Sequence, residues 1–234
     1  PTGVRGAAWD ERDPSLSLPS ATCRASTWDL EALHTIGLLS AMEGRRKGID
    51  VVLGPTINLH RSPRGGRHFE AYSEDPYLTG ALAVAYIKGV QEQGVGACPK
   101  HYVANDSEND RFNMNSVVDE QTLRELYLAP FEAAVVQADA WSIMSAYNRT
   151  NGVTMTENDL LEHPLKDEWG FSGVVVSDWT AVRSVEASAS AAQDWAMPGP
   201  VGPWAEGLLE AVRAGRVPMT AIDDKVLRML RMAN

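Results

Sequence analysis

A carboxylate beside an indole, Asp178-Trp179, follows the most strongly β-branched run of the chain, Val174-Val175-Val176. At the end of a buried strand, the carboxylate could project into a partly desolvated pocket while the flat indole stacks on a pyranose ring. Aspartate is also a preferred N-cap residue, so Asp178 taken alone fits the start of a following helix at least as well. The polar residues at the other strand ends favour the sugar chemistry.

Lys100-His101 ends another predicted strand, Tyr147 ends a third, and Arg67 ends a turn whose glycines permit a tight backbone. As an isolated pair, Lys100 and His101 could serve only a salt bridge and a helix cap. Beside an aspartate, they and Arg67 would donate hydrogen bonds to sugar hydroxyls, and a nearby cation would keep the aspartate ionised. These side chains are therefore candidate sugar contacts.

The elements that must position these side chains alternate between apolar strands and amphipathic helices, which predicts βα crossover units. We expect helices over residues 29–47, 77–93, 120–137, 160–168 and 220–232, and strands over 51–53, 94–102, 141–147, 174–176 and 194–197. Such a pattern fits either a barrel or a doubly wound sheet, and both gather functional groups at the carboxyl ends of the strands. About five or six strands are visible, fewer than a closed barrel has.

Composition and charge exclude several partners. The 234 residues carry a formal net charge of −10, and the longest basic run is Arg45-Arg46-Lys47 inside a predicted helix. Nucleic acid is therefore not an expected partner, because phosphate binding needs a basic face. No window approaches roughly 18 consecutive apolar residues, so we expect no membrane partner either.

The chain also lacks the usual motifs for metals, nucleotides and serine hydrolysis. No two of its five histidines have metal-ligand helical spacing, which predicts no metal and no cofactor. Residues 64–67 have neither a P-loop ending nor a dinucleotide fingerprint, and no Gly-x-Ser-x-Gly elbow occurs. Cys23 and Cys98 are too few for a disulfide framework, and we expect each to be a buried free thiol.

Taken in order, the segments of the chain resemble glycoside hydrolase family three enzymes of the β-glucosidase type over most of its length. Seven segments carry the resemblance: Pro1 to Gly6, Leu53 to Arg67, Tyr72 to Tyr77, Lys100 to Asn105, Met144 to Asn148, Val175 to Trp179 and Met197 to Pro200. Each segment alone is weak, whereas all seven in the family's order are highly specific. The resemblance implies an α/β fold, a (β/α) TIM-like barrel that is incomplete, in a single catalytic domain over residues 1–234.

By the same resemblance, Asp178 looks like the nucleophile of a retaining β-glycosidase that acts on terminal β-D-glucosyl residues. Arg67, Lys100, His101 and Tyr147 match positions that hold the sugar, and Trp179 matches a wall of the subsite. The expected partner is a small saccharide or glycoside. The family's opening aspartate, just before the Pro1-Thr2-Gly3 motif, is not in the sequence.

Retaining glycosidases need a second carboxyl group as the general acid/base, about 5 to 5.5 Å from the nucleophile. In β-glucosidase-type members this group is a glutamate from a domain after the barrel, so we expect such a C-terminal domain in the parent chain. Possible internal substitutes are Glu43, Glu70, Glu74, Glu108 and Asp110, none of which we favour.

Two alternatives remain open. The N-acetylglucosaminidase branch carries its acid/base on a barrel loop that begins Lys-His-Phe-Pro-Gly-His, where this sequence has Lys100 to Asn105 instead. The other alternative is a carbohydrate-binding segment that keeps the sugar contacts without turnover. An isolated chain without a proton donor would be weakly active or inactive.

Overall fold

The helix predicted over residues 29–47 forms as α2 (Leu30–Arg46) in the computed structural model, which describes residues 14–234. The Asp29 side chain caps α2 by accepting hydrogen bonds from two backbone N–H groups of its first turn. The helix predicted over 77–93 forms as α3 (Pro76–Gln91), capped by Asp75 and started by a proline at its first position. Residues 1–6, the first segment of the resemblance, lie outside the described residues.

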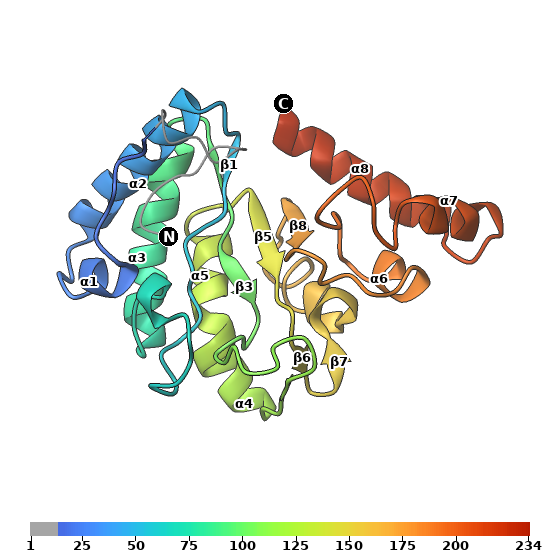
Figure 1. The fold of residues 1–234 in the computed structure, drawn as a ribbon, viewed down its shortest axis with the longest axis horizontal. Coiled ribbons are helices and arrows are strands. Elements are labelled where there is room, and N and C mark those ends of the chain that lie inside the picture. Colours follow the sequence, from blue (N-terminus) through green and yellow to red (C-terminus); the bar gives the residue numbers. More distant parts are fainter. Residues whose placement is uncertain (1–13) are drawn as a thin grey trace.

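Helices α2 and α3 lie side by side at one flank of the molecule (Figure 1). Glycines allow their backbones to touch. A Cβ atom on Gly37 would lie 2.3 Å from the Tyr86 carbonyl oxygen, and one on Gly89 would lie 2.2 Å from the His34 carbonyl oxygen. No other residue fits at these two positions without moving the helices apart.

The third predicted helix, over residues 120–137, is confirmed with an irregular centre. It runs from α4 (Glu120–Thr122) through a π-helical segment (Leu123–Leu128) into α5 (Ala129–Val136). Pro130 lies in the first turn of α5, directly after the π-helical segment, so the irregular hydrogen-bonding of the helix falls where the proline has no N–H group to donate. The chain therefore stays helical despite the proline.

Short parallel strands form the centre of the fold (Figure 1). One parallel pair joins β1 (Val51–Val52) to β2 (Gly96–Ala97), and a second sheet has the order β3 (Lys100–Tyr102), β5 (Ser142–Ser145), β8 (Val174–Ser177). A parallel bridge between Thr56 and Lys100 joins the segment after β1 to β3. The strand predicted over 94–102 is thus two strands, which pair with different neighbours.

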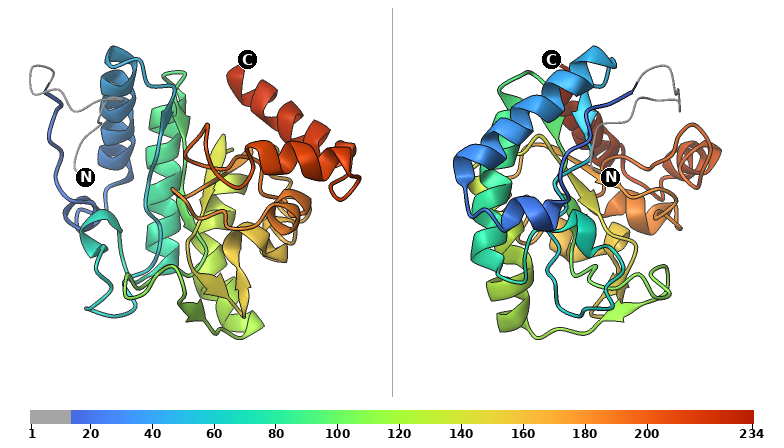
Figure 2. Two further views of the ribbon diagram at one scale, coloured as in Figure 1. Left: turned by 45° about the vertical axis from the view of Figure 1, so that its right-hand side comes forward. Right: turned by 60° about the vertical axis from the view of Figure 1, so that its left-hand side comes forward.

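The architecture agrees with the predicted α/β class. Within residues 14–234 the strands do not close into a barrel; they form an open wall with α2, α3 and α5 on one side (Figure 2). A small mixed sheet of β4 (Asn115–Ser116), β6 (Arg149–Thr150) and β7 (Val153–Thr154) adjoins one end of this wall.

Two predicted elements are wrong. The helix expected over 160–168 is instead a 3₁₀ turn (Asp159–Leu161) followed by further turns, because Pro164 cannot donate a helical hydrogen bond. The strand expected over 194–197 is reduced to one parallel bridge between Val176 and Trp195. A 3₁₀ turn (Met155–Glu157) precedes the first of these regions.

The core lies between the helices and the strand wall, where Tyr102 packs edge-on against Phe131 with ring centroids 5.1 Å apart. A second, smaller cluster holds the C-terminal helices α6 (Glu186–Ser190), α7 (Glu206–Arg213) and α8 (Met219–Ala233). Helix α8 confirms the prediction over 220–232. Its Arg228 Nη1 donates to the Phe171 carbonyl oxygen at 2.8 Å, which ties α8 to the segment before β8.

A buried ion pair supports β8 from the same side. Lys166 Nζ lies 2.7 Å from Asp194 Oδ1, and Asp194 Oδ2 accepts a 2.8 Å hydrogen bond from the Val175 backbone N–H. Both charged side chains are almost fully buried. This pair therefore stabilises the strand that directly precedes Asp178.

The remaining elements are α1 (Ala21–Ala25) and a 3₁₀ turn (His68–Glu70) that follows Arg67. Cys98 is buried as predicted, but Cys23 is exposed because it lies on the outer face of α1. Both are free thiols. No helix among residues 14–234 has the length and apolar character needed to cross a membrane.

Candidate active site

Asp178 lies directly after β8 and is 8% exposed. Its backbone N–H donates to the Ser145 carbonyl oxygen at 3.1 Å, and its Oδ1 accepts the Trp179 backbone N–H at 2.8 Å. The next helix, α6, begins only at Glu186, with Val185 at its N-cap position. Asp178 is therefore not a helix cap, and its second oxygen is free to face the site.

That second oxygen faces His101. The distance from Asp178 Oδ2 to His101 Nε2 is 3.4 Å, and the histidine side chain is almost fully buried. Lys100 pairs with Met144 in β5 while Tyr102 pairs with the next residue, Ser145, so His101 is an extra residue in the ladder. This bulge explains how two adjacent side chains, Lys100 and His101, both reach the site instead of alternating between faces.

Glu70 joins the two predicted cations. Its Oε2 lies 3.7 Å from Lys100 Nζ and accepts a 3.1 Å hydrogen bond from Thr56 Oγ1. Its Oε1 accepts a hydrogen bond from Arg67 Nε. Burial works to raise the pKa of Glu70, but the hydrogen bond from Arg67 and the charge of Lys100 outweigh burial and lower that pKa. Glu70 is therefore held ionised, which makes it unsuited to donate a proton.

Arg67 also lies 3.7 Å from Glu108 through its Nη1 atom, and Glu108 in turn accepts a 2.6 Å hydrogen bond from Arg111. Asp178 adds a further negative charge that favours the ionised forms of Arg67 and Lys100. Burial lowers the pKa of Lys100, and Glu70 and Asp178 oppose that effect. The candidate residues thus belong to one network of charges rather than to separate pairs.

The side chain of Tyr147, which follows β5, lies near Asp178. Burial, reinforced by the negative charge of Asp178, raises the pKa of Tyr147 to about 12. The phenol is therefore protonated at neutral pH. Its ring is held by Arg111, whose guanidinium lies 4.3 Å from the ring centroid, and by Phe112, 4.6 Å between ring centroids.

Trp179 is 39% exposed, so one part of the indole is available to a ligand next to Asp178. This exposure fits the wall predicted for it. The structure therefore brings the six predicted side chains into one region. Tyr147, Asp178 and Trp179 follow the carboxyl ends of β5 and β8, Lys100 and His101 lie within β3, and Arg67 lies in the loop after β1.

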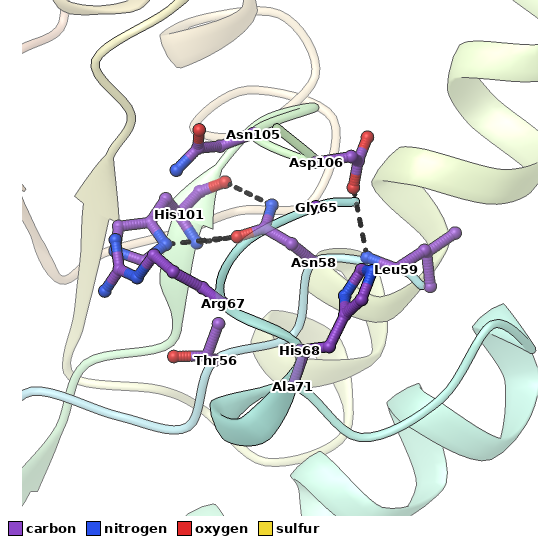
Figure 3. A pocket seen from close by; sticks show the side chains of 10 residues that line it. All are labelled: Thr56, Asn58, Leu59, Gly65, Arg67, His68, Ala71, His101, Asn105 and Asp106. Atoms are coloured by element: carbon purple, nitrogen blue, oxygen red, sulfur yellow. Dashed lines mark hydrogen bonds between the residues drawn. The ribbon is translucent and has the colours of Figure 1, made fainter. Parts of the chain in front are cut away.

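A small cavity of about 20 Å³, enough for roughly one water molecule, lies beside the charge network. Figure 3 shows its lining, which includes Arg67, His101, Asn58, Asn105 and Asp106. The Asn105 amide is 6% exposed and has no hydrogen-bond partner within residues 14–234. Burial raises the pKa of Asp106 to about 6.

The sequence did not indicate which residues contact and position the predicted site residues. Glu70 follows Arg67 by three residues, and Arg111 follows Glu108 by the same spacing, a local charge pattern that could have indicated both pairs. No local sequence pattern indicates that Asn58 contacts His101, because the two residues are 43 positions apart in the sequence. Among the described residues, no group of three His, Cys, Asp or Glu side chains could hold a metal ion.

Fold and site together define the class of α/β domains with a parallel strand wall, helices packed against it, and a cluster of charged side chains beside the strands. The protein family described as "Glycosyl hydrolase family 3 N terminal domain" matches residues 11–232 of the chain. The chain therefore belongs to glycosyl hydrolase family 3, as its seven segments indicated.

Relatives and solved structures agree with this membership. The chain is 48% identical over 217 residues to a β-glucosidase of Rhizobium radiobacter, covering 92% of this chain and 26% of that protein. It superimposes on β-glucosidase 3B from Thermotoga neapolitana in complex with glucose with a TM-score of 0.94 and 40% identity, covering 99% of this chain and 34% of that one. The β-glucosidase from Kluyveromyces marxianus in complex with glucose gives a TM-score of 0.95 at 40% identity, with coverages of 99% and 28%. The chain thus spans between a quarter and about a third of the length of these relatives.

Proposed function

We propose that this chain forms the sugar-binding and nucleophilic part of a β-glucosidase-type hydrolase that acts on terminal β-D-glucosyl residues. Asp178 attacks the anomeric carbon, the bond to the leaving oxygen breaks, and a covalent glycosyl-aspartate forms that water then hydrolyses. The observation that carries the proposal is the position of Asp178, buried at a strand end with one oxygen facing His101 at 3.4 Å.

The surrounding residues have distinct roles in this proposal. The protonated phenol of Tyr147, next to Asp178, donates to the attacking carboxylate and orients it. Arg67 and Lys100 present N–H donors to sugar hydroxyls while Glu70 balances their charge, which keeps two buried cations from repelling each other. The half-exposed Trp179 supplies an apolar face for the C–H side of the sugar ring.

The general acid is proposed to come from another part of the parent protein. The carboxylates of the charge network, Glu70 and Glu108, are both bonded to arginines, and the pKa of Glu70 is lowered by Arg67 and Lys100 against the effect of its burial. A proton donor needs the opposite environment, one that raises its pKa toward neutrality. A glutamate from a following domain, as the family resemblance implies, would supply it.

Aryl β-glucosides with good leaving groups test this proposal, because their departure needs little acid help. We expect release of aryl product by the protein, and a loss of at least about 1,000-fold in the Asp178→Asn variant, because removing a triad-type nucleophile typically costs that much or more. The exposed Asp223→Asn on α8 is the matched control and should retain full activity.

Equal turnover in the Asp178→Asn variant would refute the nucleophile assignment. Glucose binding by calorimetry without any release of aryl product would instead support the alternative of a carbohydrate-binding segment.

A further inference from the structure

The side-chain amide of Asn58 forms hydrogen bonds with both the backbone and the ring of His101 (Figure 3). Asn58 Oδ1 accepts the His101 backbone N–H at 2.8 Å, and Asn58 Nδ2 donates to the His101 carbonyl oxygen at 2.9 Å. A flipped amide would place donor against donor and acceptor against acceptor. The hydrogen-bond chemistry therefore fixes the orientation of this amide.

The same Asn58 oxygen lies 3.1 Å from His101 Nδ1. An amide oxygen can only accept, so Nδ1 must carry a hydrogen. In a neutral imidazole the other nitrogen, Nε2, then holds a lone pair and no hydrogen.

The surroundings of His101 favour the neutral ring. The histidine is 1% exposed, and its charged neighbours are Lys100 on its own strand, Arg67 before the 3₁₀ turn, Arg111 in the loop after β3, and Asp178 after β8. Burial, reinforced by the three cations, lowers the pKa of His101 well below its ordinary value.

Two acceptors therefore face each other across the site, His101 Nε2 and Asp178 Oδ2, at 3.4 Å. Their lone pairs repel unless a hydrogen-bond donor lies beside both. A sugar hydroxyl is such a donor, and it would give its hydrogen to Nε2 without tying up the attacking oxygen. An imidazolium in the same place would stabilise the carboxylate's charge and weaken it as a nucleophile.

We propose that Asn58 is a positioning residue that holds His101 in the Nδ1–H tautomer, so that Nε2 accepts a hydrogen bond from a sugar hydroxyl beside Asp178. This inference rests on the proposed function for the identity of the donor, but the tautomer itself can be measured without substrate. It reverses the donor role that the sequence predicted for His101.

The test is a long-range proton–nitrogen NMR spectrum of the protein labelled with ¹⁵N-histidine, with His101 assigned by its loss in a His101→Gln variant. We expect a pyrrole-type signal for Nδ1 and an unprotonated, pyridine-type signal for Nε2 at neutral pH. An Nε2–H tautomer, or a fully protonated ring at neutral pH, would overturn the inference and leave the proposed function standing.

Two variants separate positioning from simple support of the fold. Asn58→Leu removes the acceptor, and we expect the Nε2–H form to appear. Asn58→Asp keeps an acceptor for Nδ1 and adds a negative charge, so the Nδ1–H tautomer should persist while His101 protonates at a higher pH than in the parent. An unchanged protonation midpoint in Asn58→Asp, or an unchanged tautomer in a folded Asn58→Leu, would contradict the inference.

Monodeoxy and monofluoro aryl glucosides test the acceptor role. At the ring position whose hydroxyl donates to Nε2, replacing that hydroxyl by fluorine should lower kcat/KM as much as replacing it by hydrogen, by about tenfold or more. The reason is that fluorine cannot donate a hydrogen bond. That penalty should shrink in Asn58→Leu. If fluorine restored activity at every position, His101 would not be an acceptor. If the tautomer were as predicted but no glucoside were cleaved, the proposed function would fail and the tautomer assignment would stand.

Discussion

Replacing Glu70 by glutamine should destabilise the protein, because it removes one negative charge from between two cations. The Glu70 side chain is 8% exposed, and its Oε2 lies 3.7 Å from Lys100 Nζ, whose side chain is 13% exposed. At that separation and an effective dielectric constant of roughly 20, the Coulomb attraction of this pair is about 4 kcal/mol. Desolvation offsets part of that attraction in the folded protein, but the glutamine variant leaves the lysine buried without its partner.

Arg67 loses less electrostatic stabilisation than Lys100 does in the Glu70→Gln variant. It is 25% exposed and still faces Glu108. We therefore expect the Glu70→Gln variant to lose about 3 kcal/mol of unfolding free energy at pH 7, the lower end of the range for breaking a buried pair. Urea denaturation followed by tryptophan fluorescence measures this difference.

The pH dependence of the loss follows from the sign of the pKa shift. Burial tends to raise the pKa of Glu70, but Arg67 and Lys100 lower it overall in the folded state, whereas an unfolded glutamate titrates at about 4.3. The stabilisation from ionised Glu70 is thus fully present above the unfolded pKa and is lost as the pH falls through the lower, folded-state pKa. The difference between parent and variant should be constant near neutrality and shrink only below about pH 4.

The matched control is Glu168→Gln, which breaks a surface pair with Arg124 at 2.8 Å whose side chains are 47% and 45% exposed. That variant should lose much less unfolding free energy than Glu70→Gln, because solvent screens an exposed ion pair. A Glu70→Gln loss no larger than the control's, or a difference that grows on acidification, would refute the assignment of Glu70 as the centre of the charge network.

Three further predictions concern other parts of the structure. Lys166→Met leaves Asp194 buried and unpaired beneath β8, so urea denaturation should show a loss of roughly 3 to 5 kcal/mol, and a loss under about 1 kcal/mol would contradict the pairing. Tyr147→Phe removes the hydroxyl that we propose donates to Asp178, so kcat/KM on an aryl β-glucoside should fall about 10- to 100-fold with the fold intact by circular dichroism; an unchanged value would show that the phenol does not act on Asp178. Burial raises the pKa of Cys98 to about 12 while Cys23 is exposed, so iodoacetamide should modify only Cys23 in the native protein, and mass spectrometry of the native and urea-treated protein checks this.

The accuracy of the predicted helices follows from how local their signals are. Asp29 and Asp75 cap α2 and α3 within the first turn, so sequence reasoning placed both helices to within two residues. The helix expected over 160–168 does not form, although its apolar spacing is helical, because Pro164 has no N–H group to donate and the segment contains only turns.

The site shows the same division between local and non-local information. Strand ends could be read from the sequence, so Asp178, Lys100, His101 and Tyr147 were found as candidates. The bulge that turns His101 into the site depends on the register between β3 and β5, which no local pattern sets.

Contacts between residues distant in the sequence also decide which side chains position the site residues. The sequence indicates Glu70 only as a possible acid, whereas its contacts with Lys100 and Arg67 make it a stable anion. Asn58 carried no signal of its own, because its role depends on a contact with a residue 43 positions away.

Covalent trapping tests the assignment of Asp178 as nucleophile most directly. A 2-deoxy-2-fluoro-β-glucosyl fluoride has a leaving group that needs little acid help, while its fluorine slows breakdown of the intermediate. After incubation, proteolysis and mass spectrometry, we predict one fluoroglucosyl adduct on the peptide that contains Asp178, and none in Asp178→Asn. An adduct on Glu70, Glu108 or any other carboxylate, with Asp178 unmodified, would contradict the assignment.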